Sequence, residues 1–346
     1  MRSLTGFIII LGFLCAAMGA FIWSCFTHVG QEKYFYIAEP AYLNMEQDDA
    51  FFPVSKEKLP ENIKSLTQKT YGAVFSESKQ DFEPNEQIAR KIIFYYDRNK
   101  RLIKRNIYGK DGKLLSDLVF KYNPKGERIA DENGESLLTY ATYNYNEKGN
   151  MAGWNNYNNE GGLISSATLK YDDKNKLIEE FRQNASDKGR EKYIYNYKGT
   201  GQKMSRMDYS SADYLSKTYA YIYNEQGKLM EWIQIRRNGY VDEREVYSYD
   251  SNGNLNEKIS YLSGSYLRDK KIYRYDNKGN KIEELMFIKP DSPFYKRSYN
   301  YNTENKLMEQ LGYSIWIDPI SKKERISSVS ERSVFEYEFY PANEKK

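Results

Sequence analysis

A pair of tyrosines recurs along this chain at a nearly constant interval, and this period constrains the fold more than any other feature of the sequence. The motif has the form Tyr-x-Tyr-(Asp/Asn)-x-x-Gly-x-Leu, and its copies are separated by intervals of 26, 23 and then six times 26 residues. A fixed period sustained over this length indicates a stacked array of one supersecondary unit. The second aromatic residue of the motif falls at Tyr96, Tyr122, Tyr145, Tyr171, Tyr197, Tyr223, Tyr249, Tyr275 and Tyr301.

Each unit predicts two antiparallel strands and two turns. The Tyr-x-Tyr spacing puts both rings on one face of a strand. Four residues after the second Tyr stand residues that tolerate the left-handed backbone ending a three-residue hairpin loop. These turn residues are Gly126, Gly149, Gly201, Gly227, Gly253 and Gly279, with Asn175 and Asn305 in two further units. The first unit has Lys100 there, and its neighbour Asn99 predicts a shifted turn.

The predicted fold is all-β: an antiparallel meander of about 18 to 20 short strands. Because strand twist accumulates, so many strands must curl, and we expect a curled or spiral sheet with the Tyr/Leu face inward. An open spiral and a closed tube both satisfy this requirement, while the many charged residues argue against a transmembrane barrel. Simple alternation after the turn predicts that Leu255, Glu257, Ile259 and Tyr261 share the face of Tyr249.

The N-terminus predicts a membrane segment. Residues 4–26 carry no charge, which is enough length for one transmembrane or signal helix. Residues 1–29 are therefore an uncleaved signal-anchor, a cleaved signal peptide, or a lipoprotein signal with Cys25 as the lipidated residue. In each case Arg2 favours the cytoplasmic side, which places residues 30–346 outside the cytoplasm.

Three further segments follow along the chain. Residues 30–90 lack the motif and predict a spacer and N-terminal cap, with one short helix from Glu61 to Lys69. Residues 91–312 form the repeat array. Residues 313–346 predict an atypical capping repeat that covers the open edge of the array.

The motif resembles the bacterial RHS/YD repeats. Tyr249-Asp250-Ser251-Asn252-Gly253-Asn254-Leu255 and Tyr275-Asp276-Asn277-Lys278-Gly279-Asn280 carry this resemblance most clearly, and it covers roughly residues 92–310. It implies a curled β-sheet shell on a secreted or surface-associated bacterial protein, some large members of the family enclosing toxin domains. This chain is short and resembles a small, membrane-tethered member located in the bacterial cell envelope, either periplasmic or at the cell surface.

The sequence contains little that predicts catalysis. The one histidine, His28, and both cysteines, Cys15 and Cys25, lie in or beside the apolar segment, so Ser-His and Cys-His nucleophiles, metal sites and cofactors are not expected in the repeats. The 52 basic and 48 acidic residues are mixed in sign throughout, which argues against nucleic acid. Glu179, Glu231, Glu257, Glu283 and Glu309 recur with the period, and recurrence predicts cross-strand charge pairs.

Trp154 and Trp232 are the candidate binding residues. Each stands nine residues after the second Tyr of its unit, and alternation puts them on the polar face, where an exposed Trp can anchor a glycan or a protein. The alternative is that both rings are covered. We therefore predict a non-catalytic binding scaffold that presents its β-repeat surface to a protein or polysaccharide. The alternative function is an accessory or immunity-like partner of a larger RHS/YD-repeat protein.

Overall fold

The computed structural model describes residues 59–76, 81–133, 139–185, 189–210, 214–289, 292–317 and 324–341. All of them belong to one compact unit, Lys56–Lys346. The predicted N-terminal helix and Cys25 lie outside the described residues. Among the residues that are described, no helix has the length and apolar character needed to cross a membrane.

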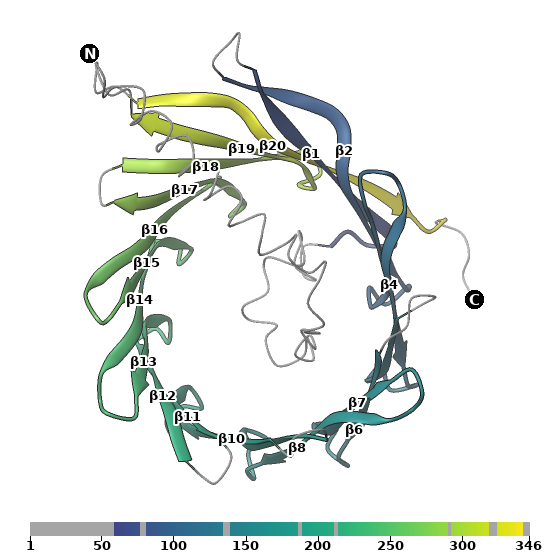
Figure 1. Cartoon of the computed structure of the whole chain (residues 1–346), viewed down its shortest axis with the longest axis vertical. Coiled ribbons are helices and arrows are strands. Elements are labelled where there is room, and N and C mark those ends of the chain that lie inside the picture. The colour runs from purple at the N-terminus through teal and green to yellow at the C-terminus, as the bar shows by residue number, and fades with distance from the viewer. Residues whose placement is uncertain are drawn as a thin grey trace, which may run out of the picture. The chain divides into compact units, whose positions relative to one another are not determined.

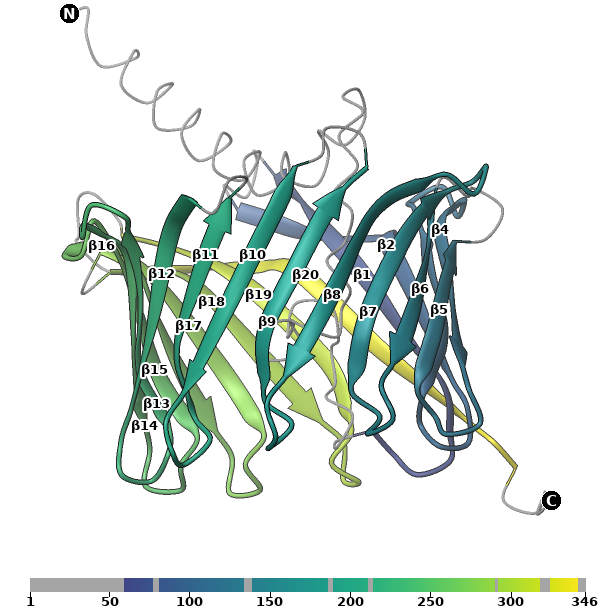
Figure 2. The same ribbon diagram turned by 90° about the horizontal axis from the view of Figure 1, so that it is seen from below.

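The described residues form twenty strands that follow one another around a ring (Figures 1 and 2). In chain order they are β1 (Ile63–Ser76), β2 (Asp81–Tyr96), β3 (Leu102–Tyr108), β4 (Leu114–Tyr122), β5 (Arg128–Asn133), β6 (Thr139–Tyr145), β7 (Met151–Asn158), β8 (Leu163–Tyr171), β9 (Leu177–Asn184), β10 (Arg190–Tyr197), β11 (Lys203–Ser210), β12 (Tyr214–Tyr223), β13 (Leu229–Arg236), β14 (Val241–Tyr249), β15 (Leu255–Leu262), β16 (Tyr266–Tyr275), β17 (Lys281–Lys289), β18 (Ser292–Tyr301), β19 (Leu307–Ile317) and β20 (Glu324–Phe339).

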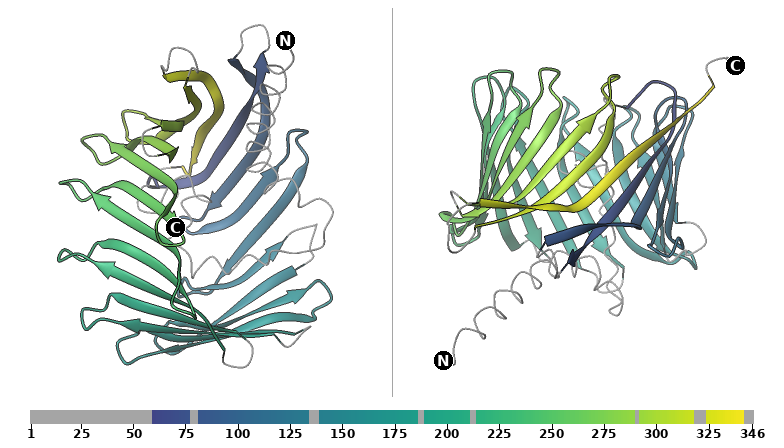
Figure 3. Two further views of the ribbon diagram at one scale, coloured as in Figure 1. Left: turned by 60° about the vertical axis from the view of Figure 1, so that its left-hand side comes forward. Right: turned by 90° about the horizontal axis from the view of Figure 1, so that it is seen from above.

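The sheet closes on itself. Every strand pairs antiparallel with the next, and β1 pairs with both β2 and β20. The seam between β1 and β20 is visible in Figure 3, and an ion pair from Lys64 to Glu338, 2.6 Å long, crosses it. Of the two forms that the sequence leaves open, an open spiral and a closed tube, the structure is the closed one, a barrel. The last strand, β20, pairs with the first strand, β1.

The helix predicted from Glu61 to Lys69 is wrong. Strand β1 begins at Ile63 and runs through this segment, which the sequence assigns to a spacer. Both of its edges form backbone ladders, for example Leu66 opposite Phe94 on β2 and opposite Tyr337 on β20. Two complete ladders stabilise a strand more than local propensity stabilises a short isolated helix.

The motif turns have the predicted geometry. In the loop after β14 the Asp250 N–H donates to the Asn254 carbonyl and the Gly253 N–H donates to the Asp250 carbonyl, both at 2.9 Å, while Gly253 has φ of +84°. The Asp250 carboxylate also accepts the N–H groups of Asn252 and Asn254. All six glycines named from the sequence have positive φ. The shifted turn predicted for the first unit is wrong, because Lys100 itself adopts φ of +57° there.

A β-bulge follows every motif turn and changes which residues share a face. Tyr249 pairs with Leu255, but Ser248 pairs with Glu257, so one extra residue interrupts the alternation. The same shift directly before the second Tyr occurs in all nine units. Beyond the bulge, Lys258 lies opposite Tyr247. The prediction that Leu255 shares the face of Tyr249 is therefore confirmed, whereas the same prediction for Glu257, Ile259 and Tyr261 is wrong.

The tyrosine face is the inner face of the barrel. On β8 the residues that alternate with Tyr171 toward the start of the strand, Leu169, Ala167 and Ser165, are buried, whereas Lys170 between them is exposed. In a closed sheet, side chains converge on the concave side and spread apart on the convex side. The systematic burial of one face therefore identifies it as the lining of the barrel.

Second tyrosines of the motif link their unit to the preceding one by donating a hydroxyl hydrogen bond to a backbone carbonyl. The Tyr249 hydroxyl donates to the Leu229 carbonyl at 2.8 Å, and the Tyr275 hydroxyl donates to the Leu255 carbonyl at the same distance. Equivalent bonds from Tyr122, Tyr145, Tyr171, Tyr197, Tyr301 and Tyr337 continue this ladder around the barrel. The strict tyrosine period thus reflects packing between units.

Candidate functional site

One residue in each unit, nine positions after the second Tyr, forms a belt on the inner wall. Because of the bulge, each belt residue lies directly opposite the first aromatic position of the motif; Trp232, for example, faces Tyr221. The belt mixes charged, aromatic and amide side chains. Its members are Arg105, Asp131, Trp154, Glu180, Arg206, Trp232, Lys258, Glu284 and Gln310.

Both tryptophans therefore line the barrel, and their expected position on the opposite face is wrong. Trp154 faces Tyr143, and only 5% of it is exposed. Its indole Nε1 is buried without a hydrogen-bond partner. Trp232 is half-buried, with its ring 5.6 Å from that of Tyr219. Their role in binding stays a prediction.

Several of the charged belt residues are paired within the wall. Glu180 is fully buried and accepts hydrogen bonds from Arg182 Nε at 2.6 Å and from the Tyr195 hydroxyl at 3.2 Å. Burial and the neighbouring Glu180 raise the pKa of Tyr195, which keeps its hydroxyl protonated as a donor.

A second buried carboxylate lies in the unit of Tyr275. Glu284 accepts a hydrogen bond of 3.0 Å from the Tyr299 hydroxyl. Burial acts to raise the pKa of Glu284, but Lys281, Lys271 and Arg297 outweigh burial and hold this pKa below its ordinary value. The carboxylate is therefore ionised at neutral pH and serves the packing of the wall.

The recurring glutamates lie on the outer face, where they form the predicted cross-strand charge pairs. Glu179 pairs with Lys170 at 2.6 Å and Glu257 with Lys270 at 2.9 Å. Glu231, Glu283 and Glu309 pair in the same way with Arg244, Arg274 and Arg332 on adjacent strands. Within the part of the chain that the structure describes, no group of three or more acidic, His or Cys side chains is placed to hold a metal ion.

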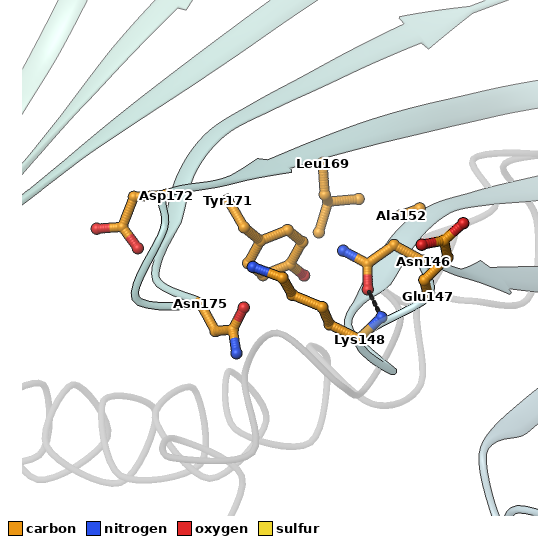
Figure 4. Close-up of a pocket in the computed structure, with 8 residues that line it drawn as sticks. All are labelled: Asn146, Glu147, Lys148, Ala152, Leu169, Tyr171, Asp172 and Asn175. Carbon is orange, nitrogen blue, oxygen red and sulfur yellow. Dashed lines mark hydrogen bonds between the residues drawn. The ribbon is translucent and has the colours of Figure 1, made fainter.

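A pocket of about 350 Å³ opens between two consecutive motif turns at one rim of the barrel (Figure 4). We call it the rim pocket. Its apolar wall comes from the Tyr171 ring and Leu169, and its lip comes from polar residues of the two turns. The lining residues are Asn146, Glu147, Lys148, Ala152, Leu169, Tyr171, Asp172 and Asn175.

The rim pocket coincides with two departures from the repeat. Ala152 stands at the bulge position, and Leu169 at the first aromatic position of the next motif. At the bulge position the other units carry Ile103, Ile129, Ile178, Met204, Met230, Asn256, Ile282 and Met308. At the first aromatic position they carry Phe94, Phe120, Tyr143, Tyr195, Tyr221, Tyr247, Tyr273 and Tyr299. Two small side chains thus line one junction. The sequence shows this departure when the units are aligned, but the motif itself does not include the position of Ala152.

A second junction provides an internal comparison. Asn150 Nδ2 donates to Asn175 Oδ1 at 3.3 Å beside the rim pocket, and Asn280 Nδ2 donates to Asn305 Oδ1 at 2.5 Å at the other junction. The two turn-to-turn contacts are equivalent, but the second junction has Ile282 and Tyr299 in place of the small pair. Size at these two positions therefore distinguishes the junctions.

No protein-family model and no curated protein matches this chain. Among solved structures it is similar to the TcdB2-TccC3-Cdc42 complex, at 11% identity and a TM-score of 0.35, over 82% of this chain and 18% of that chain. It is also similar to porin-like proteins from Bacteroides uniformis (8% identity, TM-score 0.36) and Bacteroides vulgatus (13%, 0.27), over 80% of this chain and 98% of each of those. The chain thus spans less than a fifth of the first of these structures.

Proposed function

We propose that this protein is a non-catalytic binding scaffold of the bacterial cell envelope, tethered through residues 4–26, and that it holds a polysaccharide or protein partner at the rim pocket. The observation that carries the proposal is the coincidence of Ala152 and Leu169 at one junction. In a repeat array, a position that departs from the period is free of the packing role that the period serves, and it is a natural place for a specific site.

The chemistry of the rim pocket favours binding over catalysis. Its volume lies at the lower end of the range for small-molecule sites, enough for one sugar ring or one large side chain. The Asp172 carboxylate already accepts the N–H groups of Lys174 and Lys176, at 2.9 and 2.8 Å, and so serves the turn. Burial and Glu180 raise the pKa of Tyr171, whose neutral phenol presents an apolar ring face. An apolar wall with a polar lip suits a ligand with one apolar and one hydroxyl-rich face.

The test restores the repeat residues. Ala152→Ile and Leu169→Tyr introduce the side chains that neighbouring units already accommodate, so the barrel should fold while the pocket fills. The full-length chain and this double variant would be compared on a glycan array and in pull-downs from envelope extracts. Met308→Ile, at the bulge position of another unit, is the matched control. We expect the double variant to lose the ligand and the control to keep it; equal binding by all three would refute the proposal.

The tryptophans are tested separately, because Trp154 is buried. Trp154→Ala should destabilise the barrel by about 3–5 kcal/mol, as is typical for truncation of a core aromatic residue. Trp154→Phe and Trp232→Ala are therefore the variants for the same binding assays. We call the Ala152→Ile and Leu169→Tyr double variant the filled-pocket variant. If Trp154→Phe and Trp232→Ala keep the ligand while the filled-pocket variant loses it, binding is assigned to the rim pocket and the tryptophans serve packing.

A further inference from the structure

Three tyrosines depart from the pattern of the others. Tyr214, Tyr240 and Tyr266 are 51%, 73% and 72% exposed, whereas every other tyrosine among the described residues is buried or half-buried. They follow one another at intervals of 26 residues, each nine positions before the second Tyr of its unit. We call them the tyrosine row. They lie at the turns in the middle of the units, at the rim opposite the rim pocket (Figure 2).

The register sets the spacing of the tyrosine row. Ile259 pairs with Val246 on one side and with Lys270 on the other. The residue equivalent to Val246 in the next unit is Ile272, which lies two residues beyond Lys270. Neighbouring units are thus displaced by two strand spacings across the sheet and two residues along it. With about 4.8 Å per strand and 3.4 Å per residue, equivalent positions lie about 12 Å apart. The three rings therefore mark a line of roughly 23 Å at regular intervals.

The surroundings of the row are polar and balanced in charge. The Arg237 guanidinium lies over the Tyr214 ring, 4.2 Å from its centroid, and so links two consecutive units. Arg236 pairs with Asp242 beside Tyr240. The row thus offers aromatic faces separated by charged groups of both signs, which include hydrogen-bond donors and acceptors.

We propose that the tyrosine row is a binding platform for an extended neutral polysaccharide. An array of tyrosines at equal intervals can be contacted at every ring by a ligand that itself repeats. Sugar rings present a face of C–H groups that stacks on an aromatic ring, and their hydroxyls match the mixed donors and acceptors between the rings. A globular protein partner needs about 800 Å² of closely packed surface, which three rings separated by polar gaps do not supply. This platform is a second surface, separate from the rim pocket.

The test uses the full-length chain and insoluble neutral polysaccharides, namely cellulose, chitin and a mixed-linkage β-glucan, in depletion assays. Tyr214→Ala, Tyr240→Ala and Tyr266→Ala would be measured singly and together. We expect each single change to weaken binding to at least one polymer by about 2- to 10-fold, in line with the loss of one aromatic contact, and the triple change to abolish it. Leu115→Ala, an exposed residue on β4 just after the mid-unit turn of another unit, is the matched control and should bind normally.

Chain length provides the second readout. Soluble oligosaccharides that span all three rings should compete far better than those that cover one. Unchanged binding by the triple alanine variant, failure of the wild-type chain to bind any of the three polymers, or equal competition by short and long oligosaccharides would each overturn the proposal. The filled-pocket variant is included in every assay: if it loses binding while the row variants keep it, the tyrosine platform fails and the rim pocket stands.

Discussion

Glu179 and Glu180 are adjacent in sequence and, because of the bulge, lie on opposite faces of the barrel, which makes them a direct test of the fold. The Glu180 side chain is fully buried and bonded to Arg182 and Tyr195. The Glu179 side chain is 30% exposed, and its partner Lys170 is 68% exposed. The two carboxylates should therefore contribute very differently to stability.

The magnitudes follow from these contacts. Removing one partner of a buried ion pair costs about 3–5 kcal/mol in general. Glutamine keeps one acceptor oxygen, and Arg182 keeps its stacking contact with the Tyr193 ring at 4.7 Å, so we expect Glu180→Gln to cost about 2–3 kcal/mol. Glu179→Gln removes an exposed ion pair and should cost about 0–1 kcal/mol.

Urea unfolding followed by circular dichroism measures both changes, and thermal unfolding should show a fall of roughly 4–10 °C for Glu180→Gln. If the side chains alternated from Tyr171 across the turn without a bulge, Glu179 would point inward and Glu180 outward. A larger loss for Glu179→Gln, or equal losses for the two variants, would therefore refute the inward assignment of Glu180 and the bulge that causes it.

Three further changes test the packing of the units. Tyr249→Phe removes the hydroxyl bond to the Leu229 carbonyl and should lower the free energy of unfolding by about 0.5–1.5 kcal/mol, measured by urea unfolding; no change would show that the tyrosine ladder is not stabilising. Gly253→Ala forces a side chain into a left-handed position, against the Lys228 ammonium group, and should cost about 1–2 kcal/mol in the same assay. Glu284 has a lowered pKa in the folded state, so its stabilising contribution is present above the unfolded value of about 4.3 and is lost as pH falls below it. The stability difference between wild type and Glu284→Gln should therefore be largest near neutral pH and shrink below about pH 4; a difference that is independent of pH would contradict this.

The sequence predicted the antiparallel strands, their approximate number and the turn geometry, because all three depend on local patterns that repeat. The faces of the strands could not be predicted. The bulge position holds residues as different as Ile178, Met204, Ala152 and Asn256, so no residue type marks the bulge. Counting by alternation across it placed Trp232 on the outer face instead of the inner wall.

Closure of the barrel could not be predicted from the sequence for another reason. It depends on pairing β1 with β20, for instance Leu66 with Tyr337, across almost the whole chain. Strand β1 lacks the motif, and its first residues are compatible with a helix. Only the two neighbouring edges, supplied by β2 and β20, determine its conformation. The rim pocket was predictable in principle, since it needs only the comparison of Ala152 and Leu169 with their counterparts.

If small side chains at two positions open the rim pocket, small side chains at the equivalent positions of the second junction should create a second pocket. Ile282→Ala with Tyr299→Leu reproduces the small pair at the junction where Asn280 and Asn305 already make the equivalent turn contact. The Tyr299 bond to Glu284 is lost, so some loss of stability is expected, and unfolding must be measured first. Calorimetry with the ligand identified on the wild-type chain should then show two sites per chain instead of one. A folded double variant that still binds one ligand per chain would show that the polar lip around Glu147 and Lys148, and not the space behind it, decides where the ligand is held.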